Sequence, residues 1–179
     1  MIQIFFPQVI ALISCLWVLV RVYFNVKTGI FNRKRELQLV FVYVCIIVVA
    51  RFTFFPLSKV DGKIQPLLFD AARMWPPRIN LLPLVNLLNY EVFREMLINV
   101  IGNTAMFIPI GIIWPAVFKA LDNHAKVIGA GVGFSLCIEI LQLPFFDRVT
   151  DVDDLLLNSI GFLIGYGIYL LVRSLRKKA

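Results

Sequence analysis

The sequence predicts an all-α, polytopic membrane protein, with five transmembrane helices in a bundle and a short interfacial or re-entrant helix in the 59–95 segment. Of its 179 residues, 60% are hydrophobic and only 16% are charged, whereas a soluble domain is near half apolar and a quarter charged. A chain of this length has too much surface per unit volume to hide that excess from water. Five apolar stretches also approach the ~20 residues that a membrane-spanning helix needs. We therefore expect residues 1–179 to form a single integral membrane domain.

The five spans differ in how strictly apolar they are. The apolar stretches 1–20, 96–118 and 155–172 carry no charged side chain, whereas 37–58 contains Arg51 and 127–146 contains Glu139. We expect the first stretch to be a retained span rather than a signal peptide, because no basic residues precede it and no small-x-small cleavage site follows it. The spans are predicted at about residues 4–24, 37–57, 96–117, 127–146 and 154–172.

The 59–95 segment, between the second and third spans, does not resemble an ordinary polar loop. Prolines punctuate it, and the part after Pro83 is rich in leucine and asparagine. This composition suits a short helix that lies in the interface or re-enters the membrane with its apolar face toward lipid. A loop packed on the bundle explains the composition equally well, so both interpretations stay open.

The basic residues indicate how the chain is oriented. The net charge is +7, and 11 of the 18 basic residues lie in the first loop, the third loop and the C-terminal tail. An odd number of spans places these three segments on one side, which we expect to be cytoplasmic, with the N-terminus outside and the C-terminus inside. These positions suit contacts with anionic lipid headgroups. They form no nucleic-acid recognition motif, so we expect membrane lipids and no nucleic acid as partners.

Polar side chains inside the spans gather toward one end of the predicted bundle. A polar group in hydrocarbon is costly unless it is paired, so each one needs a reason. Because successive spans alternate in direction, these positions share a slab roughly 10–15 Å thick at ~1.5 Å rise per residue. We expect them to line a polar pocket open to the outer leaflet, with the arginines balancing the carboxylates. They are Arg51, Asn99, Asn103, Ser135, Glu139, Gln142, Arg148, Asp151, Asp154 and Asn158.

Most of these residues also have a purely structural interpretation. An aspartate at the start of the fifth span can cap free N–H groups. Amides within spans can fix helix packing through hydrogen bonds worth about 0.6–2 kcal/mol each. Gly161 and Gly165 form a G-x-x-x-G pattern, which is typical of close helix contacts. Glu139 is the hardest to explain structurally, because a carboxylate within a span must pair with a cation or stay protonated.

Three motifs carry most of the polar positions. They are Asn99-x-x-x-Asn103, Glu139-x-x-Gln142 and Arg148-x-x-Asp151-x-Asp153-Asp154-x-x-x-Asn158-x-x-Gly161-x-x-x-Gly165. They resemble the VanZ-like family of small bacterial membrane proteins, over about residues 36–172. The resemblance implies an integral protein of the bacterial cytoplasmic membrane and cell envelope. The family's namesake is associated with resistance to the glycopeptide antibiotic teicoplanin, but the family supplies no established chemical mechanism.

Three functions remain as hypotheses. In the first, the pocket binds a lipid headgroup or a lipid-linked wall precursor, with Arg51 and Arg148 suited to a phosphate, and this affects teicoplanin susceptibility. In the second, an intramembrane enzyme modifies an envelope lipid, with Glu139 as general acid or base. Asp151 and Asp154 could then hold a divalent cation, the one cofactor that the sequence suggests. In the third, the polar cluster only packs helices. The sequence leaves the oligomeric state open.

Overall fold

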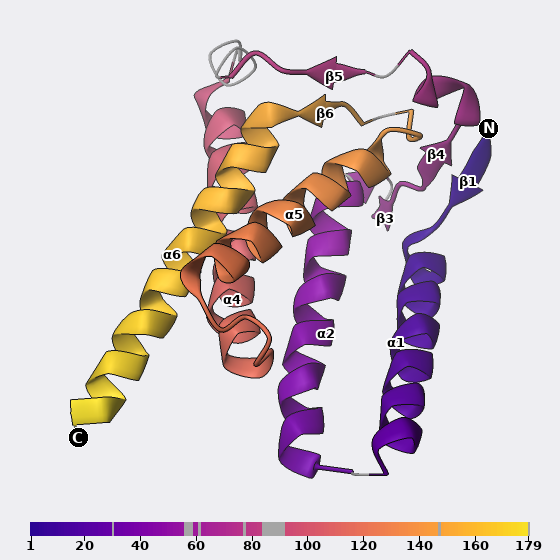
Figure 1. The fold of residues 1–179 in the computed structure, drawn as a ribbon. Coiled ribbons are helices and arrows are strands. Elements are labelled where there is room, and N and C mark those ends of the chain that lie inside the picture. The colour runs from indigo at the N-terminus through magenta and orange to yellow at the C-terminus, as the bar shows by residue number, and fades with distance from the viewer. Residues whose placement is uncertain are drawn as a thin grey trace. The chain divides into compact units, whose positions relative to one another are not determined.

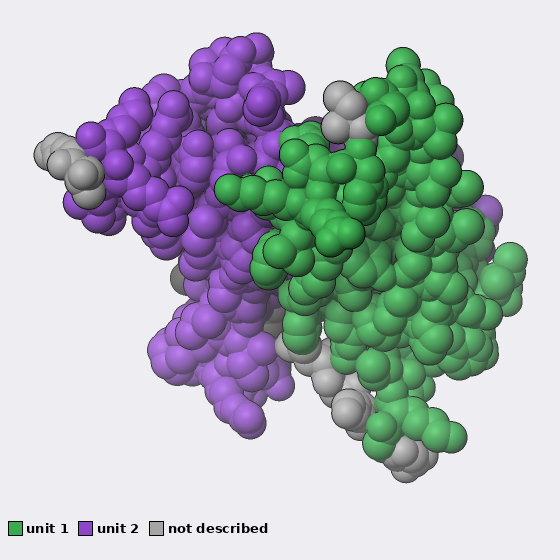
Figure 2. All heavy atoms as spheres, turned by 90° about the horizontal axis from the view of Figure 1, so that it is seen from below, with its two compact units in different colours: residues 1–69 green, residues 70–179 purple. Residues whose placement is uncertain are grey.

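The computed structural model describes residues 1–29, 31–55, 59–60, 62–76, 78–83, 92–146 and 148–178. The chain forms two compact units, Met1–Phe69 and Asp70–Ala179 (Figures 1 and 2). Five of the described helices are long and apolar enough to cross a membrane. The predicted all-α class and the predicted number of spans are therefore confirmed. The single integral membrane domain expected for the whole chain stays a prediction.

The first unit contains an antiparallel helical hairpin (Figure 1). Helix α1 (Phe6–Thr28) ends at Gly29, which adopts the left-handed conformation at φ 63° and donates its N–H to a carbonyl of the last turn. Glycine reaches this conformation at little cost, so it is a common helix terminator. Helix α2 (Arg33–Phe54) begins after Asn32, whose side chain accepts the N–H of Arg35 as an N-cap.

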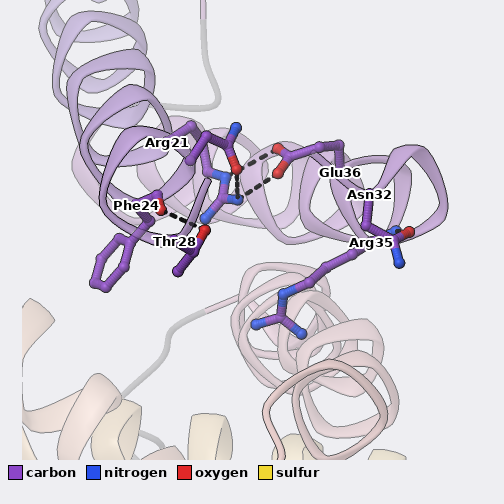
Figure 3. A network of polar contacts seen from close by, with 7 residues as sticks. Arg21, Phe24, Thr28, Asn32, Arg35 and Glu36 are labelled. Carbon is purple, nitrogen blue, oxygen red and sulfur yellow. Dashed lines mark hydrogen bonds and ion pairs between the residues drawn. The ribbon is translucent and has the colours of Figure 1, made fainter. Parts of the chain in front are cut away.

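Polar contacts join the two helices of this hairpin. The guanidinium of Arg21 faces the carboxylate of Glu36 and forms an ion pair with it (Figure 3), with Nε 2.9 Å from Oε2. Farther along the hairpin, the hydroxyl groups of Ser14 and Tyr43 lie 2.7 Å apart. Polar contacts of this kind stabilise helix association in a membrane, because apolar helix faces gain little free energy by moving from lipid to another helix.

Short strands complete the first unit. Strand β1 (Ile2–Ile4) pairs antiparallel with β4 (Leu67–Phe69), and β2 (Lys59–Val60) pairs antiparallel with β3 (Lys63–Ile64). The segment that follows the second span therefore begins with strands rather than a helix. The predicted interfacial or re-entrant helix falls mainly on residues 84–91, which lie outside the described residues, and it stays a prediction.

The second unit contains three long helices and a small parallel strand pair. The helix of the fourth span ends at Gln142, four residues before the predicted end of that span. Pro144 follows closely and cannot donate a backbone hydrogen bond, so the helix does not continue through it. The last helix continues past residue 172 into the basic tail. The elements are η1 (Ala71–Met74), β5 (Ile79–Asn80), α4 (Phe93–Val117), α5 (His124–Gln142), β6 (Thr150–Asp151) and α6 (Val152–Lys178).

Helices α4 and α6 cross with their backbones in close contact. A Cβ added at Gly161 would collide with the carbonyl of Thr104, and one at Gly165 would collide with the carbonyl of Ile108. On the α4 side, Gly111 meets the backbone of α6 in the same way. The G-x-x-x-G pattern is thus a helix-packing motif, and it holds α6 against α4.

Candidate functional site

The candidate site lies where α4 begins, α5 ends and α6 begins, beside the β5–β6 pair (Figure 1). The parallel pairing sets Ile79 opposite Thr150 and Asn80 opposite Asp151. Asn80 Nδ2 donates to Asp151 Oδ1 over 3.2 Å, while Asn80 Oδ1 accepts the N–H of Leu82 over 3.2 Å. Asn80 is therefore a member of the site that the span-based argument missed, because it lies in a segment without helical periodicity.

Glu139 holds β6 against the end of α5. Its side chain is only 2% exposed, and Oε2 accepts the backbone N–H of Asp151 over 3.0 Å. Its main-chain carbonyl accepts the hydroxyl of Thr150 over 2.8 Å. We call this pair of hydrogen bonds the Glu139–β6 contact. The Glu139 carboxylate thus accepts a hydrogen bond from the backbone amide of Asp151. The sequence argument had expected an arginine as its partner.

Asp151 caps the last helix, a role that the sequence predicted for one of the aspartates at its start. Its Oδ1 accepts the N–H of Asp153, in the first turn of α6, over 3.0 Å. A carboxylate in this position satisfies a free helix N–H and complements the positive end of the helix dipole. The same oxygen accepts from Asn80, so Asp151 links α6 to β5 as well.

Asp154 joins α6 to α4. Asn103 donates from Nδ2 to Asp154 Oδ1 over 2.6 Å and also lies 3.5 Å from the side-chain oxygen of Asn99. Arg148 lies three residues before Asp151, in the segment that leads into β6. All four side chains are half-buried, and so is Asp151. We call these five residues (Asn99, Asn103, Arg148, Asp151 and Asp154) the polar rim, since they keep some exposure.

Deeper in the unit, the polar side chains are fully enclosed. Asn158 on α6 donates to the hydroxyl of Ser135 on α5 over 3.0 Å, and the two residues are 1% and 0% exposed. Gln142 is 5% exposed. Asn158 Oδ1 accepts no hydrogen bond from any residue that the structure describes. The bond between Asn158 and Ser135 joins α6 to α5 beneath the rim, and the predicted contact of Asn158 and Gln142 with a ligand stays a prediction.

Arg51 belongs to the first unit. Its Nη1 donates to the carbonyl of Phe55 over 3.1 Å, and its guanidinium lies 5.8 Å and 5.6 Å from the ring centroids of Phe6 and Phe52. These distances suit cation–π contacts. The predicted meeting of Arg51 with the residues of the second unit stays a prediction.

A half-open cavity of about 190 Å³ lies beside Glu139. Its surface is almost entirely apolar, although Glu139, Thr150 and Asp151 take part in its wall. The cavity is apolar because those three side chains turn hydrogen-bonding atoms toward each other or toward Asn80. The polar pocket expected from the sequence stays a prediction. The remaining lining residues are Ile79, Leu81, Leu136, Ile140, Leu143, Val152 and Leu155.

Asp151 and Asp154 are the candidate ligands for a divalent cation. Within the described part of the chain, no three His, Cys, Asp or Glu side chains converge as a metal site. Oδ1 of each aspartate accepts N–H groups of neighbouring residues. A divalent cation bound by this pair stays a prediction.

These features define a class: a multi-pass α-helical membrane protein whose last three spans share a network of carboxylates and amides at one end. A sequence model of the VanZ/LLP1 family matches residues 40–173, and the chain belongs to this family. Over 77 residues it is 36% identical to the protein VanZ of Enterococcus faecium; this stretch is 43% of the chain and 45% of that relative. The match thus spans less than half of the relative's length. No solved structure matches the chain significantly.

Proposed function

We propose that this protein acts in the bacterial cytoplasmic membrane by binding a lipid headgroup or a lipid-linked wall precursor, and that this binding lowers susceptibility to teicoplanin. The observation that carries the proposal is the polar rim. Two different helices and the segment before α6 bring these hydrogen-bonding side chains to one end of the second unit, where they stay half-exposed. Ionisable groups within membrane spans are rare, and they commonly mark binding sites or ion pathways.

The chemistry of the rim suits a phosphorylated, hydroxyl-bearing headgroup. The guanidinium of Arg148 matches a phosphate in shape and charge. The amides of Asn99 and Asn103 offer donors and acceptors, and the carboxylates of Asp151 and Asp154 accept hydrogen bonds from hydroxyl or amino groups. Arg51, in the first unit, is proposed as a second cation for the same phosphate.

The orientation we propose places the N-terminus outside and the C-terminus in the cytoplasm. It is supported by the 11 basic residues in the first loop, the third loop and the tail. The rim then faces the outer leaflet, where it can alter the envelope surface that an antibiotic meets.

Arginine substitutions test this function directly. A deletion strain would be complemented with the wild-type chain, Arg148→Ala, Arg51→Ala or the control Arg176→Ala in the basic tail, and the teicoplanin concentration that inhibits growth would be measured. We expect both site variants to lose the effect of the wild type, while the control keeps it. Membrane abundance, measured by immunoblotting, should be equal for all four chains. An unchanged inhibitory concentration with Arg148→Ala would show that the rim does not carry this function.

A further inference from the structure

We propose that the apolar cavity beside Glu139 binds a hydrocarbon chain of the lipid whose headgroup occupies the polar rim. This inference rests on the proposed function and specifies its ligand as a molecule held by both its headgroup and its chain. We call the cavity the chain groove. The residues that carry the argument are Ile79, Leu81, Leu136, Ile140 and Leu143.

The chemistry of the groove selects an apolar occupant. Glu139 directs Oε2 to the N–H of Asp151, and Thr150 directs its hydroxyl to the carbonyl of Glu139. The wall consequently offers almost no polar surface. A sugar or phosphate placed there would lose its hydration without gaining hydrogen bonds, which is unfavourable. A hydrocarbon chain has no such penalty.

The size of the groove fits part of a lipid rather than a whole compact ligand. Its volume is about 190 Å³, below the roughly 300–1,000 Å³ typical of pockets that enclose drug-sized molecules. An apolar cavity of about 150 Å³ already takes up benzene. The groove therefore accommodates a stretch of one chain, and the rest of the lipid must lie outside it.

The position of the groove connects the lipid phase with the rim. Leu136 and Ile140 come from α5, one of the membrane-spanning helices, and are 46% and 54% exposed. Ile79 in β5 and Leu81 just after it come from extended chain that runs beside β6 (Figure 1). Asp151 belongs both to the groove wall and to the rim. A lipid whose chain enters between α5 and β5 thus brings its headgroup to Asp151.

Photo-cross-linking tests this proposal with the full chain in vesicles. The vesicles would contain phosphatidylethanolamine and phosphatidylglycerol, with a rising fraction of phosphatidylglycerol that carries a diazirine within one acyl chain. Labelled peptides would be identified by mass spectrometry. We expect labelling at Leu136, Ile140 and Leu143 to saturate as the probe fraction rises. Labelling around Leu163, a 43% exposed residue of α6 outside the groove, should rise in proportion to the probe.

Substitutions that fill the groove provide the matched control. Leu136→Trp should reduce groove labelling severalfold, to the level found around Leu163, whereas Leu163→Trp should leave it unchanged. Ile140→Trp serves as a second filling variant if Leu136→Trp does not reach the membrane, because its side chain is more exposed. Labelling that rises linearly in the groove, or that survives both filling variants, would overturn the proposal.

The outcomes separate this inference from the proposed function. If Arg148→Ala removes the teicoplanin effect but groove labelling does not saturate, the headgroup site stands and the groove inference fails. If groove labelling saturates but Arg148→Ala leaves susceptibility unchanged, the groove binds a chain and the proposed function fails.

Discussion

The crossing of α4 and α6 gives a quantitative test through Gly161→Ala. The new Cβ would lie 2.8 Å from the carbonyl carbon of Thr104 and closer still to its oxygen. Both are backbone atoms, so the helices must separate rather than a side chain rotate. Inserting a methyl group into a well-packed contact costs about 1–3 kcal/mol. Gly167 lies on the same helix with nothing within 4 Å of its added Cβ. Gly167→Ala should therefore be neutral or stabilise by up to about 1 kcal/mol.

The assay compares the two variants in a background with one tryptophan. Trp114 on α4 lies with its ring centroid 6.1 Å from that of Phe162 on α6, so its fluorescence reports on the helix contact. With Trp17 and Trp75 replaced by phenylalanine, unfolding in a graded denaturing detergent would be followed by this emission. We expect Gly161→Ala to unfold at a lower detergent fraction than Gly167→Ala. Equal midpoints for the two variants would refute the close crossing.

Further predictions concern the polar network. Glu139→Ala should destabilise the protein by about 1–3 kcal/mol, because the N–H of Asp151 loses its acceptor. Glu139→Gln keeps an acceptor oxygen and should destabilise the protein less. Unfolding of both variants in detergent measures the difference. Envelope lipids analysed by mass spectrometry should be the same with Glu139→Gln as with the wild type, and a changed lipid profile would favour the enzyme hypothesis instead. Asn103→Ala should lower the stability by a similar amount, because Asp154 loses its hydrogen-bond donor. If Asn103→Leu were as stable as the wild type in the same unfolding assay, that hydrogen bond would have no role in stability.

The spans were predictable because length and apolarity alone decide whether a segment can cross a membrane. Helix ends were less predictable where local chemistry intervenes, as at Pro144, which stops α5 earlier than its apolar run suggests. The β5–β6 pair could not be predicted. Two-residue strands carry no periodicity, and the partners Asn80 and Asp151 are far apart in the sequence. Their register depends on tertiary contacts that no local pattern encodes.

The depth of the polar residues was predictable, but their partners were not. Helical rise and alternating direction place Asn103 and Asp154 at one level, and the structure joins them directly. Depth does not fix the rotation of a helix about its axis, so the backbone N–H that bonds Glu139 was not foreseen. The polar pocket expected from the residue types stays a prediction, whereas the groove beside Glu139, with its almost entirely apolar surface, was not foreseen.

The Glu139–β6 contact determines which substitutions can report on ligand binding. Glu139 holds Asp151, and Asp151 in turn caps α6 and binds Asn80 of β5. Loss of Glu139 therefore disturbs α6, the rim and the groove at once, and a lost phenotype would not distinguish binding from folding. Arg148 lies instead in the segment before β6, where its side chain is half-exposed. Arg148→Ala changes the charge offered to a headgroup and involves neither hydrogen bond of the Glu139–β6 contact. A phenotype that it loses at equal membrane abundance therefore reports on ligand binding more directly than one lost with Glu139→Ala.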